Sequence, residues 1–234
     1  PAGLRWELIV VDNNCTDRTQ DVLKSHADKL PLRPFTEAKQ GLSHARNRAV
    51  AEARGALLLW TDDDVLVHPD WLAESVAAAE RFPDADVFGG PIRPWFEAPP
   101  PAWVTRNLSR LGHCWALLDH GPDVRPLAAG EQVFGANMGF RLAALKRYPY
   151  DPSLGRTGAS LASGEEAAVI AAMRADGRSG VWVGSAPVDH WVTAKRVTAA
   201  YVSGIVRWEA AHGLKRLANE GPKLFGVPRW VWRW

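Results

Sequence analysis

Three consecutive aspartates, Asp62 to Asp64, follow the apolar run 56–60 after a single threonine. The uninterrupted run predicts a buried strand. Adjacent carboxylates repel one another unless a cation neutralises them, and Mg²⁺ or Mn²⁺ prefers such oxygen ligands and often bridges them to phosphate. Because ligands bind at the carboxyl ends of strands in open α/β sheets, the motif indicates a metal–phosphate site. A solvated acidic turn explains the motif alone equally well.

A fourth carboxylate, Asp12, ends a second apolar run, and we expect it to share one sheet edge with the aspartate triplet. Arg46 and Arg48 lie between them in the sequence, at the start of an expected helix. Arginine binds phosphate or diphosphate by paired hydrogen bonds. A surface salt bridge is the simpler alternative, and it is favoured more strongly for Arg48.

Two further carboxylates, Glu165 and Glu166, open a later helix. The helix dipole stabilises them as anions, and an ionised carboxylate facing a pocket can act as a general base. The spacing of Ser163 and Glu166 also matches a capping box, in which Glu166 only satisfies a backbone N–H. Farther on, His190 is a candidate metal ligand with Asp189 as a weak supporting partner, although a lone histidine is more often structural.

Alternating apolar and turn segments predict the elements that must position these residues. Strands are expected at 7–12, 56–60, 87–92, 133–140 and 181–183, with a loop and a short strand within 29–35. Helices are expected at 17–28, 43–54, 69–82, 163–177 and 197–217. The pattern predicts an α/β fold with a doubly wound, mostly parallel sheet, flanking helices and a C-terminal helical segment. Five prolines between residues 91 and 103 predict an exposed loop there.

Length, apolar content, net charge and cysteine count indicate which classes of protein this chain can belong to. The chain has 234 residues, 47% of them apolar, which suffices for one large α/β domain or two small ones. A net charge of +2 argues against a nucleic-acid partner. Two cysteines form neither a disulfide framework nor a metal cluster, no apolar run reaches the ~18 residues of a membrane span, and no signal peptide is recognisable. These features predict a cytoplasmic location.

Tryptophan is unusually frequent, with 12 residues. Five of them lie in the last 44 residues among arginines and lysines: Trp191, Trp208, Trp230, Trp232 and Trp234. Trp with basic residues suits a membrane interface, so peripheral contact with the inner face of a membrane is one interpretation. Ordinary core tryptophans beside a solvated basic face are the simpler one.

Five segments together resemble the GT-A-fold glycosyltransferases of family 2. They are 9–17, 41–47, 61–64, 135–141 and 164–166, in the family's order and spacing. The resemblance covers nearly all of residues 7–190. It implies a transferase domain over residues 1–192, followed by a helical, Trp- and Arg-rich segment over 193–234.

The resemblance also implies roles for single residues. Asp12 would contact the base of a nucleoside diphosphate sugar, Arg46 would lie near its phosphates, and Asn137 near the donor sugar. Asp62 and Asp64 would form the D-x-D pair, with Asp64 the main ligand of Mn²⁺ or Mg²⁺. His190 would complete the metal site. Glu166 occupies the position of the catalytic base and Glu165 matches the residue before it. Both are catalytic candidates, and the sequence leaves open which of the two is the base.

Three positions depart from the family pattern. The usual opening strand, with its Pro-x-Tyr-Asn-like turn, is missing before residue 1, so the chain is either a fragment or takes that strand from elsewhere. Val65 stands where an acidic residue is common. Glu166 replaces the usual aspartate.

The expected reaction is therefore an inverting, metal-dependent transfer of a sugar to an acceptor hydroxyl. A glycan, a lipid-linked glycan or a protein would serve as acceptor. Two alternatives stay open: a phosphatase of the haloacid dehalogenase type with Asp62 as nucleophile and Asp64 as acid/base, and a non-catalytic nucleotide-sugar binder.

Overall fold

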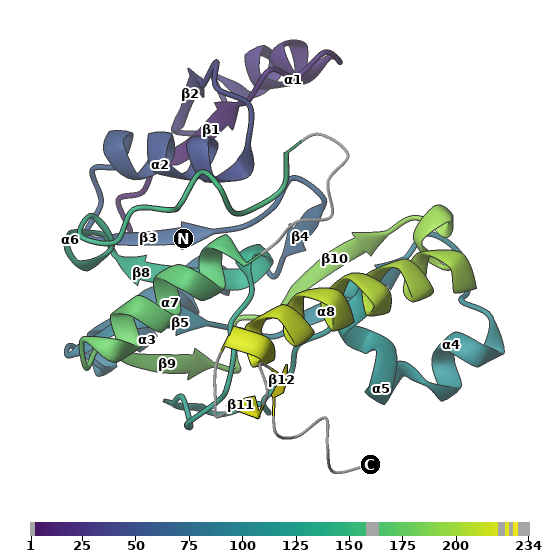
Figure 1. Ribbon diagram of the computed structural model, residues 1–234. Helices are drawn as coiled ribbons and strands as arrows, with labels where there is room; N and C mark the ends of the chain where they lie inside the picture. Colours follow the sequence, from purple (N-terminus) through teal and green to yellow (C-terminus); the bar gives the residue numbers. More distant parts are fainter. Residues whose placement is uncertain (1–2, 158–163, 220–222, 225–226, 229–234) are drawn as a thin grey trace. The chain divides into compact units, whose positions relative to one another are not determined.

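The computed structural model describes residues 3–157, 164–219, 223–224 and 227–228 (Figure 1). The chain divides into two compact units. Unit 1 comprises residues 1–95 and 116–191, and unit 2 comprises residues 96–115 and 192–234. Every residue with an expected chemical role falls in unit 1, so the fold of that unit positions the site.

A five-stranded sheet is the centre of unit 1. Its strands, in spatial order, are β3 (Leu57–Trp60), β8 (Met138–Arg141), β5 (Ala85–Gly89), β9 (Ser179–Val183) and β7 (Val124–Pro126). β3, β5 and β9 share one direction, while β8 and β7 run against them. The α/β class is confirmed, and the sheet is mixed because β8 is inserted antiparallel between β3 and β5.

Two helices cover opposite faces of this sheet. Along β3, Leu57 and Leu59 pack with α3 (Trp71–Arg81), whereas Leu58 and Trp60 pack with α7 (Glu165–Ala175). The alternation follows from the two-residue period of a strand. Figure 1 shows α7 lying along the sheet. A strand that is apolar at every position is thus buried from both sides, as the sequence predicts.

The expectation of a single sheet is wrong for the described residues. β1 (Leu8–Asp12) pairs in parallel with β2 (Leu32–Thr36), and these two strands form a sheet of their own. Helices α1 (Thr19–His26) and α2 (Leu42–Glu52) follow these strands. Asp12 therefore ends a different sheet from the one that leads to the aspartate triplet, because no described strand joins β1 to β3 by backbone hydrogen bonds.

The proline-rich stretch contains a strand that we did not expect. β6 (Ile92–Phe96) joins β10 (Val188–Val192) and β4 (Val65–Val67) in a three-stranded sheet with order β4–β10–β6. Pro94 is tolerated because β6 is an edge strand, where an N–H can be spared. Two expected strands have other bounds in the structure. The strand expected at 87–92 is β5, which lies earlier, at Ala85–Gly89. The segment expected as a strand at 133–140 contains a 3₁₀ turn at Gly135–Asn137, and β8 begins only at Met138.

Unit 2 is helical and has a small core of its own. Its helices are α4 (Ala102–Arg106), α5 (Leu108–Leu111) and α8 (Ala199–Asn219), with 3₁₀ turns at Gly112–Trp115 and Ala194–Arg196. The buried side chains of Val104, Trp115, Val192 and Val202 form this core. The Trp115 indole N–H donates to the Arg196 carbonyl at 2.9 Å. The helix expected at 197–217 is confirmed.

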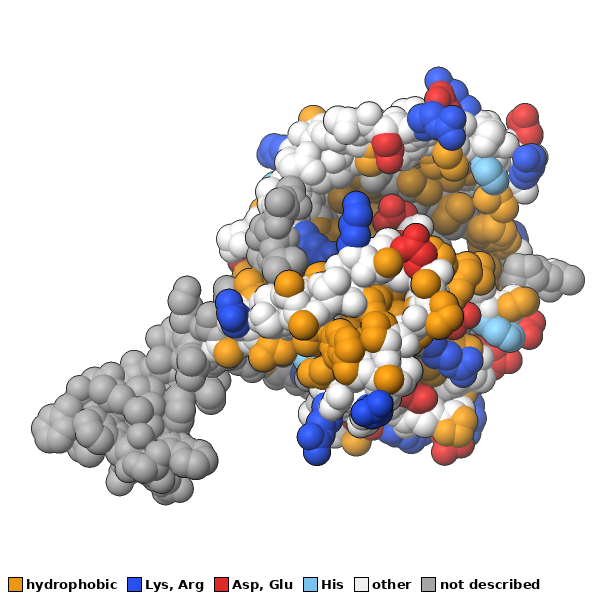
Figure 2. Space-filling model, turned by 90° about the vertical axis from the view of Figure 1, so that its right-hand side faces the viewer, with side chains coloured by type: hydrophobic (Ala, Val, Ile, Leu, Met, Phe, Trp, Pro, Cys, Tyr) orange, Lys and Arg blue, Asp and Glu red, His pale blue; other side chains and the backbone are white. Residues whose placement is uncertain are grey.

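The Trp- and Arg-rich end falls mostly outside the description, since residues 229–234 are not covered. The short strands β11 (Lys223–Leu224) and β12 (Val227–Pro228) pair with each other, and α6 (Leu142–Leu145) follows β8 in unit 1. Among the described helices, none has the length and apolarity that a membrane crossing requires. On the face drawn in Figure 2, patches of hydrophobic side chains lie between charged ones.

Candidate active site

The aspartate triplet lies between two strands of different sheets. β3 ends at Trp60 and β4 begins at Val65. β10 runs antiparallel to β4, and His190 is paired with Val65, so the imidazole comes next to the triplet. His190 Nε2 lies 3.4 Å from Asp64 Oδ1, and the Trp191 N–H donates to the Asp64 carbonyl at 2.8 Å. The structure therefore brings together Asp64 and His190, which are 126 positions apart in the sequence.

Asp62 is set deeper than its two neighbours. Burial raises the pKa of its carboxyl, and the negative charges of Asp64 and Asp63 raise it further. The positive charges of Arg46 and His190 act against this rise. The carboxyl of Asp62 is thus close enough to both sides of the site to feel their charges, and a bound cation would favour its ionised form.

A buried ion pair joins helices α2 and α7. Arg46 and Glu165 are 4% and 2% exposed, and Arg46 Nη1 lies 2.7 Å from Glu165 Oε1. The same nitrogen lies 3.7 Å from Glu166 Oε2. The guanidinium also stacks near the rings of Trp60 and Tyr150, at 5.7 and 5.4 Å from their centroids. We call Arg46, Glu165, Glu166, Trp60 and Tyr150 the closed cluster.

The two glutamates of the closed cluster have different surroundings. Burial, followed by repulsion from Glu166, raises the pKa of Glu165 to about 7, and the charge of Arg46 lowers it only in part. The side chain of Glu166 is 19% exposed, against 3% for Glu165. Glu166 is therefore the more accessible of the two glutamates, although its Oε2 is buried.

The capping alternative for Glu166 does not match the start of α7. The N-cap of this helix is Gly164, in the left-handed conformation, and Glu166 is the second helical residue. A capping box needs its acidic residue at the third helical position. Ser163, the expected cap, lies outside the described residues.

Two glycines make room for the closed cluster, and the sequence alone did not identify their role. A Cβ on Gly135 would lie 2.3 Å from Arg46 Nη2, which no real contact allows. Gly155 has a φ of +87°, and a Cβ there would lie 3.1 Å from the Glu165 carboxyl. The only signal in the sequence was the position of Gly135 within the segment 135–141. Its physical reason is the close approach of the guanidinium.

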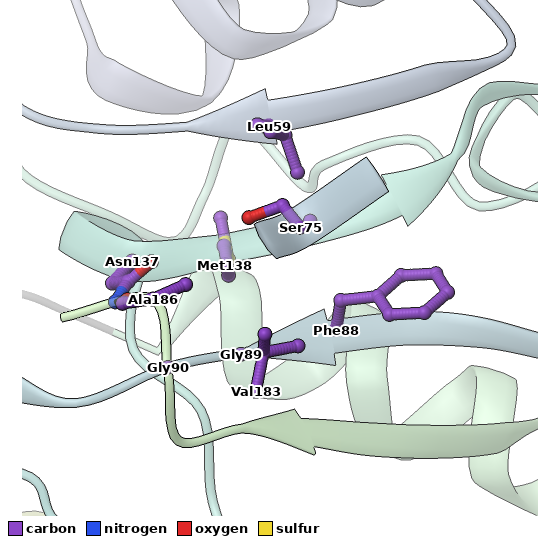
Figure 3. Close-up of a pocket in the computed structure, with 10 residues that line it drawn as sticks. Leu59, Ser75, Phe88, Gly89, Gly90, Asn137, Met138, Val183 and Ala186 are labelled. Carbon is purple, nitrogen blue, oxygen red and sulfur yellow. The ribbon is translucent and has the colours of Figure 1, made fainter. Parts of the chain in front are cut away.

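Asn137 does not join the aspartate triplet and His190. It is 4% exposed, accepts a hydrogen bond from the Trp71 indole at 2.8 Å, and donates to the carbonyls of Pro91 and Ala186 at 3.0 and 2.9 Å. Figure 3 shows its side chain beside Ala186 and Gly90. The void next to it measures about 10 Å³, at or below the roughly 10–15 Å³ that a water needs. Its amide therefore holds loop ends together.

Asp12 is also engaged locally. Its carboxylate accepts hydrogen bonds from the Cys15 N–H at 2.8 Å and the Gln20 amide at 2.5 Å, which lower the pKa of Asp12. The neighbouring Asn13 ties the strand end to the loop before α2, since its amide donates to the Glu37 and Lys39 carbonyls and its oxygen accepts from Gly41 N–H. Asp12 thus fixes the turn after β1.

The remaining candidates take the simpler roles. Arg48 Nε lies 3.0 Å from Glu52 Oε1, one helical turn along α2, so the salt-bridge interpretation is confirmed. Asp189 alternates with the buried Val188 and His190 along β10 and is paired with Leu66, so its side chain points away from the face of His190.

The triplet fits a metal ion that is shared with a ligand. Across the described part of the chain, no three His, Cys, Asp or Glu side chains are arranged to hold a metal by themselves. Asp64 and His190 offer one carboxylate and one imidazole, with Asp62 close by. Mg²⁺ and similar ions are commonly held by one or two carboxylates together with substrate phosphates, so this donor set suits an ion bound with a diphosphate. Arg46 is already paired with Glu165 and leaves the triplet short of positive charge.

Comparisons with known proteins identify the family of the chain. A family model described as Glycosyl transferase family 2 matches residues 2–122. The chain is 29% identical, over 167 residues, to the glucosyl-dolichyl phosphate glucuronosyltransferase of Haloferax volcanii, which covers 69% of this chain and 51% of the relative. The chain thus spans about half the length of this curated relative.

Two solved structures share the fold. The Staphylococcus aureus protein TarS, residues 1–349 in complex with UDP, superposes with a TM-score of 0.58 at 16% identity, covering 80% of this chain and 51% of that one. The mannosyltransferase PcManGT of Pyrobaculum calidifontis, in complex with GDP-Man and Mn²⁺, gives 0.56 at 18% identity, covering 95% and 58%. These likenesses concern the fold, which is GT-A. The family match extends over more than half of the 234 residues, and the chain therefore belongs to glycosyl transferase family 2.

Proposed function

We propose that this chain carries out the inverting, metal-dependent transfer of a sugar from a nucleoside diphosphate sugar to an acceptor hydroxyl. The observation that carries the proposal is the meeting of two groups around Asp62: the Asp64–His190 pair on one side and the closed cluster on the other. Structures with the same fold hold UDP in one case and GDP-Man with Mn²⁺ in the other. We assign this chemistry to residues 1–192 and treat 193–234 as an accessory segment.

The donor side is built on the triplet. Asp64 and His190, with Asp62, would hold Mn²⁺ or Mg²⁺, which when bound supplies charge stabilisation to the departing diphosphate. Asp62 is buried, so its ionisation is costly without a cation, and a bound ion would stabilise its carboxylate. Asp12, at the end of β1, remains our candidate for the nucleotide base. We assign Asn137 to the framework because its amide is fully used.

Glu166 is our candidate for the base. It combines partial exposure with a position 3.7 Å from Arg46, so it can reach solvent and still be oriented. Glu166 would take the proton from the acceptor hydroxyl as that oxygen attacks the anomeric carbon. Glu165, buried at 2.7 Å from Arg46, is a positioning residue that fixes the guanidinium and, through it, Glu166.

The phosphatase alternative receives no support from the comparisons, which match the transferase family. The non-catalytic binder differs from our proposal only in turnover. Release of nucleoside diphosphate from the bound donor would distinguish the two.

Calorimetry with Asp64→Ala tests the donor site. UDP, GDP and their sugars are titrated into the wild type with Mn²⁺ and with a chelator. We expect Mn²⁺-dependent binding by the wild type and a loss of about 10- to 100-fold in Asp64→Ala. Asp84→Ala is the matched control, because Asp84 is exposed and remote from the triplet. It precedes the amino end of β5, whereas the triplet follows the carboxyl end of β3, and these two strands run in the same direction. A folded wild type that binds no nucleotide, or equal binding by Asp64→Ala, contradicts the proposal.

A further inference from the structure

An open hollow of about 360 Å³ lies next to Asp64. Six residues line it: Asp63, Asp64, Val65, Leu66, Trp95 and Trp191. We call this set the open hollow, and all six belong to unit 1. We propose that it is the acceptor subsite and that it takes the ring of an uncharged sugar. The inference rests on the proposed function, since Asp64 is shared with the donor site.

An exposed aromatic face forms one wall. Trp95 is 48% exposed, although large apolar side chains usually avoid water. Its ring packs edge-to-face on Trp191, with centroids 4.6 Å apart and planes at 78°. β6 and β10 belong to the same sheet, so both indoles are anchored on strands. The contact with Trp191 therefore orients the exposed indole as a flat apolar surface. Binding a ligand there would cost little conformational entropy of this side chain.

Carboxylates form the other wall. Asp63 is exposed, and 31% of the Asp64 side chain is exposed. Carboxylates accept hydrogen bonds and donate none when ionised. A ligand for this hollow needs an apolar face for Trp95 and Leu66 and several O–H donors for the acids. A pyranose ring offers both, with C–H groups on its faces and hydroxyls around its rim.

Other acceptor parts match the lining less well. A hydrocarbon chain would desolvate the carboxylates of Asp63 and Asp64 without giving them a hydrogen-bond partner. A uronic acid or a phosphate would bring a negative charge against Asp63, the lining carboxylate that we do not assign to the metal site. The chemistry of the lining therefore favours a neutral sugar at the accepting end, whatever larger molecule carries it.

Saturation-transfer NMR on the full chain tests this inference directly, without turnover. The probes are methyl glucoside and methyl mannoside as neutral rings, methyl glucuronide as the charged ring, and hexanol as the hydrocarbon. We expect transfer from the protein to the ring C–H protons of the neutral glycosides. We expect Trp95→Ala to weaken their binding about fivefold or more, and Trp95→Phe, which keeps an aromatic face, to weaken it less.

Two controls separate this inference from the proposed function. Trp6→Ala removes another exposed tryptophan, 38% exposed, and is expected to leave glycoside binding unchanged. Nucleotide binding is measured by calorimetry on the same proteins and is expected to survive Trp95→Ala. Glycoside binding that Trp95→Ala leaves unchanged overturns the subsite even if nucleotides bind. Preference for the glucuronide or for hexanol overturns the class of ligand. If no nucleotide binds while Trp95→Ala abolishes glycoside binding, the subsite stands and the proposed donor site fails.

Discussion

Arg46 and Trp95 both belong to groups that adjoin the aspartate triplet, yet Arg46 is 4% exposed and Trp95 is 48% exposed. The Arg46 guanidinium lies among two carboxylates and two aromatic rings, all within the closed cluster. Around Trp95, an apolar ring and two carboxylates face solvent. The closed cluster is suited to orienting the Glu166 side chain, and the open hollow is suited to binding a ligand from solvent. Substitutions in the closed cluster should therefore change turnover or stability, whereas substitutions in the open hollow should change ligand binding.

The largest effect is expected for Glu166→Gln, at the rim of the closed cluster. Glutamine keeps the size of the side chain but cannot accept the proton. Turnover should fall by about 10²–10⁴-fold while donor binding stays nearly intact. The measurement is the rate of nucleoside diphosphate release from the donor that calorimetry identifies. Glu80→Gln, exposed on α3, is the control. Weaker donor binding with normal turnover would refute the assignment of Glu166 as base.

A large loss of stability is expected for Arg46→Ala. The substitution leaves Glu165 and Glu166 buried without their counter-ion, which typically costs about 3–5 kcal/mol. Arg48→Ala is the matched control on the same helix, because its pair with Glu52 is much more accessible, with side chains 38% and 29% exposed, and should contribute about 0.5 kcal/mol or less. Urea unfolding gives both free energies. Similar losses for the two variants would remove the distinction between the closed cluster and an ordinary surface pair.

The closed cluster also shows what the sequence could and could not predict. The strand before the triplet was predictable because residues 56–60 form an uninterrupted apolar run, whereas the strand that carries His190 was not predicted, and His190 was singled out by its residue type and by the family resemblance. The pairing of Arg46 with Glu165 was not predictable, because it joins helices 119 positions apart and depends on packing. For the same reason, the sequence could not show that the Asn137 amide is consumed by the carbonyls of Pro91 and Ala186.

The strands that we missed or displaced have a physical cause too. Pro94 suggested a loop, but a proline is compatible with an edge strand, and β6 is the edge of its sheet. β2 shows the same property, with Pro34 in a two-stranded sheet where both strands are edges. Composition identifies segments that can be strands, while sheet order decides which of them tolerate proline. That order is a tertiary property, and so is the separation of β1 from β3.

A smaller effect is expected on the pH dependence of stability, and Glu165 in the closed cluster is its source. Its pKa is raised from 4.5 to about 7. A raised folded-state pKa means that Glu165 contributes its full stability below pH of about 4.5 and loses that contribution as the pH rises through about 7. Glu165→Gln lacks this titration, so its melting temperature relative to wild type should rise between pH 4.5 and 7 and level off above. Thermal melts over this range measure the difference.

Glu131→Gln is the control of opposite sign. Its partner Arg125 lowers the pKa of Glu131 to about 2, so the contribution of Glu131 is present above pH of about 4.5 and is lost only as the pH falls toward 2. Between pH 4.5 and 7 the difference between Glu131→Gln and wild type should stay constant. A constant difference for Glu165→Gln as well would mean that Glu165 is ionised throughout this range. Arg46 would then neutralise it fully, and the closed cluster would orient Glu166 through a permanent ion pair.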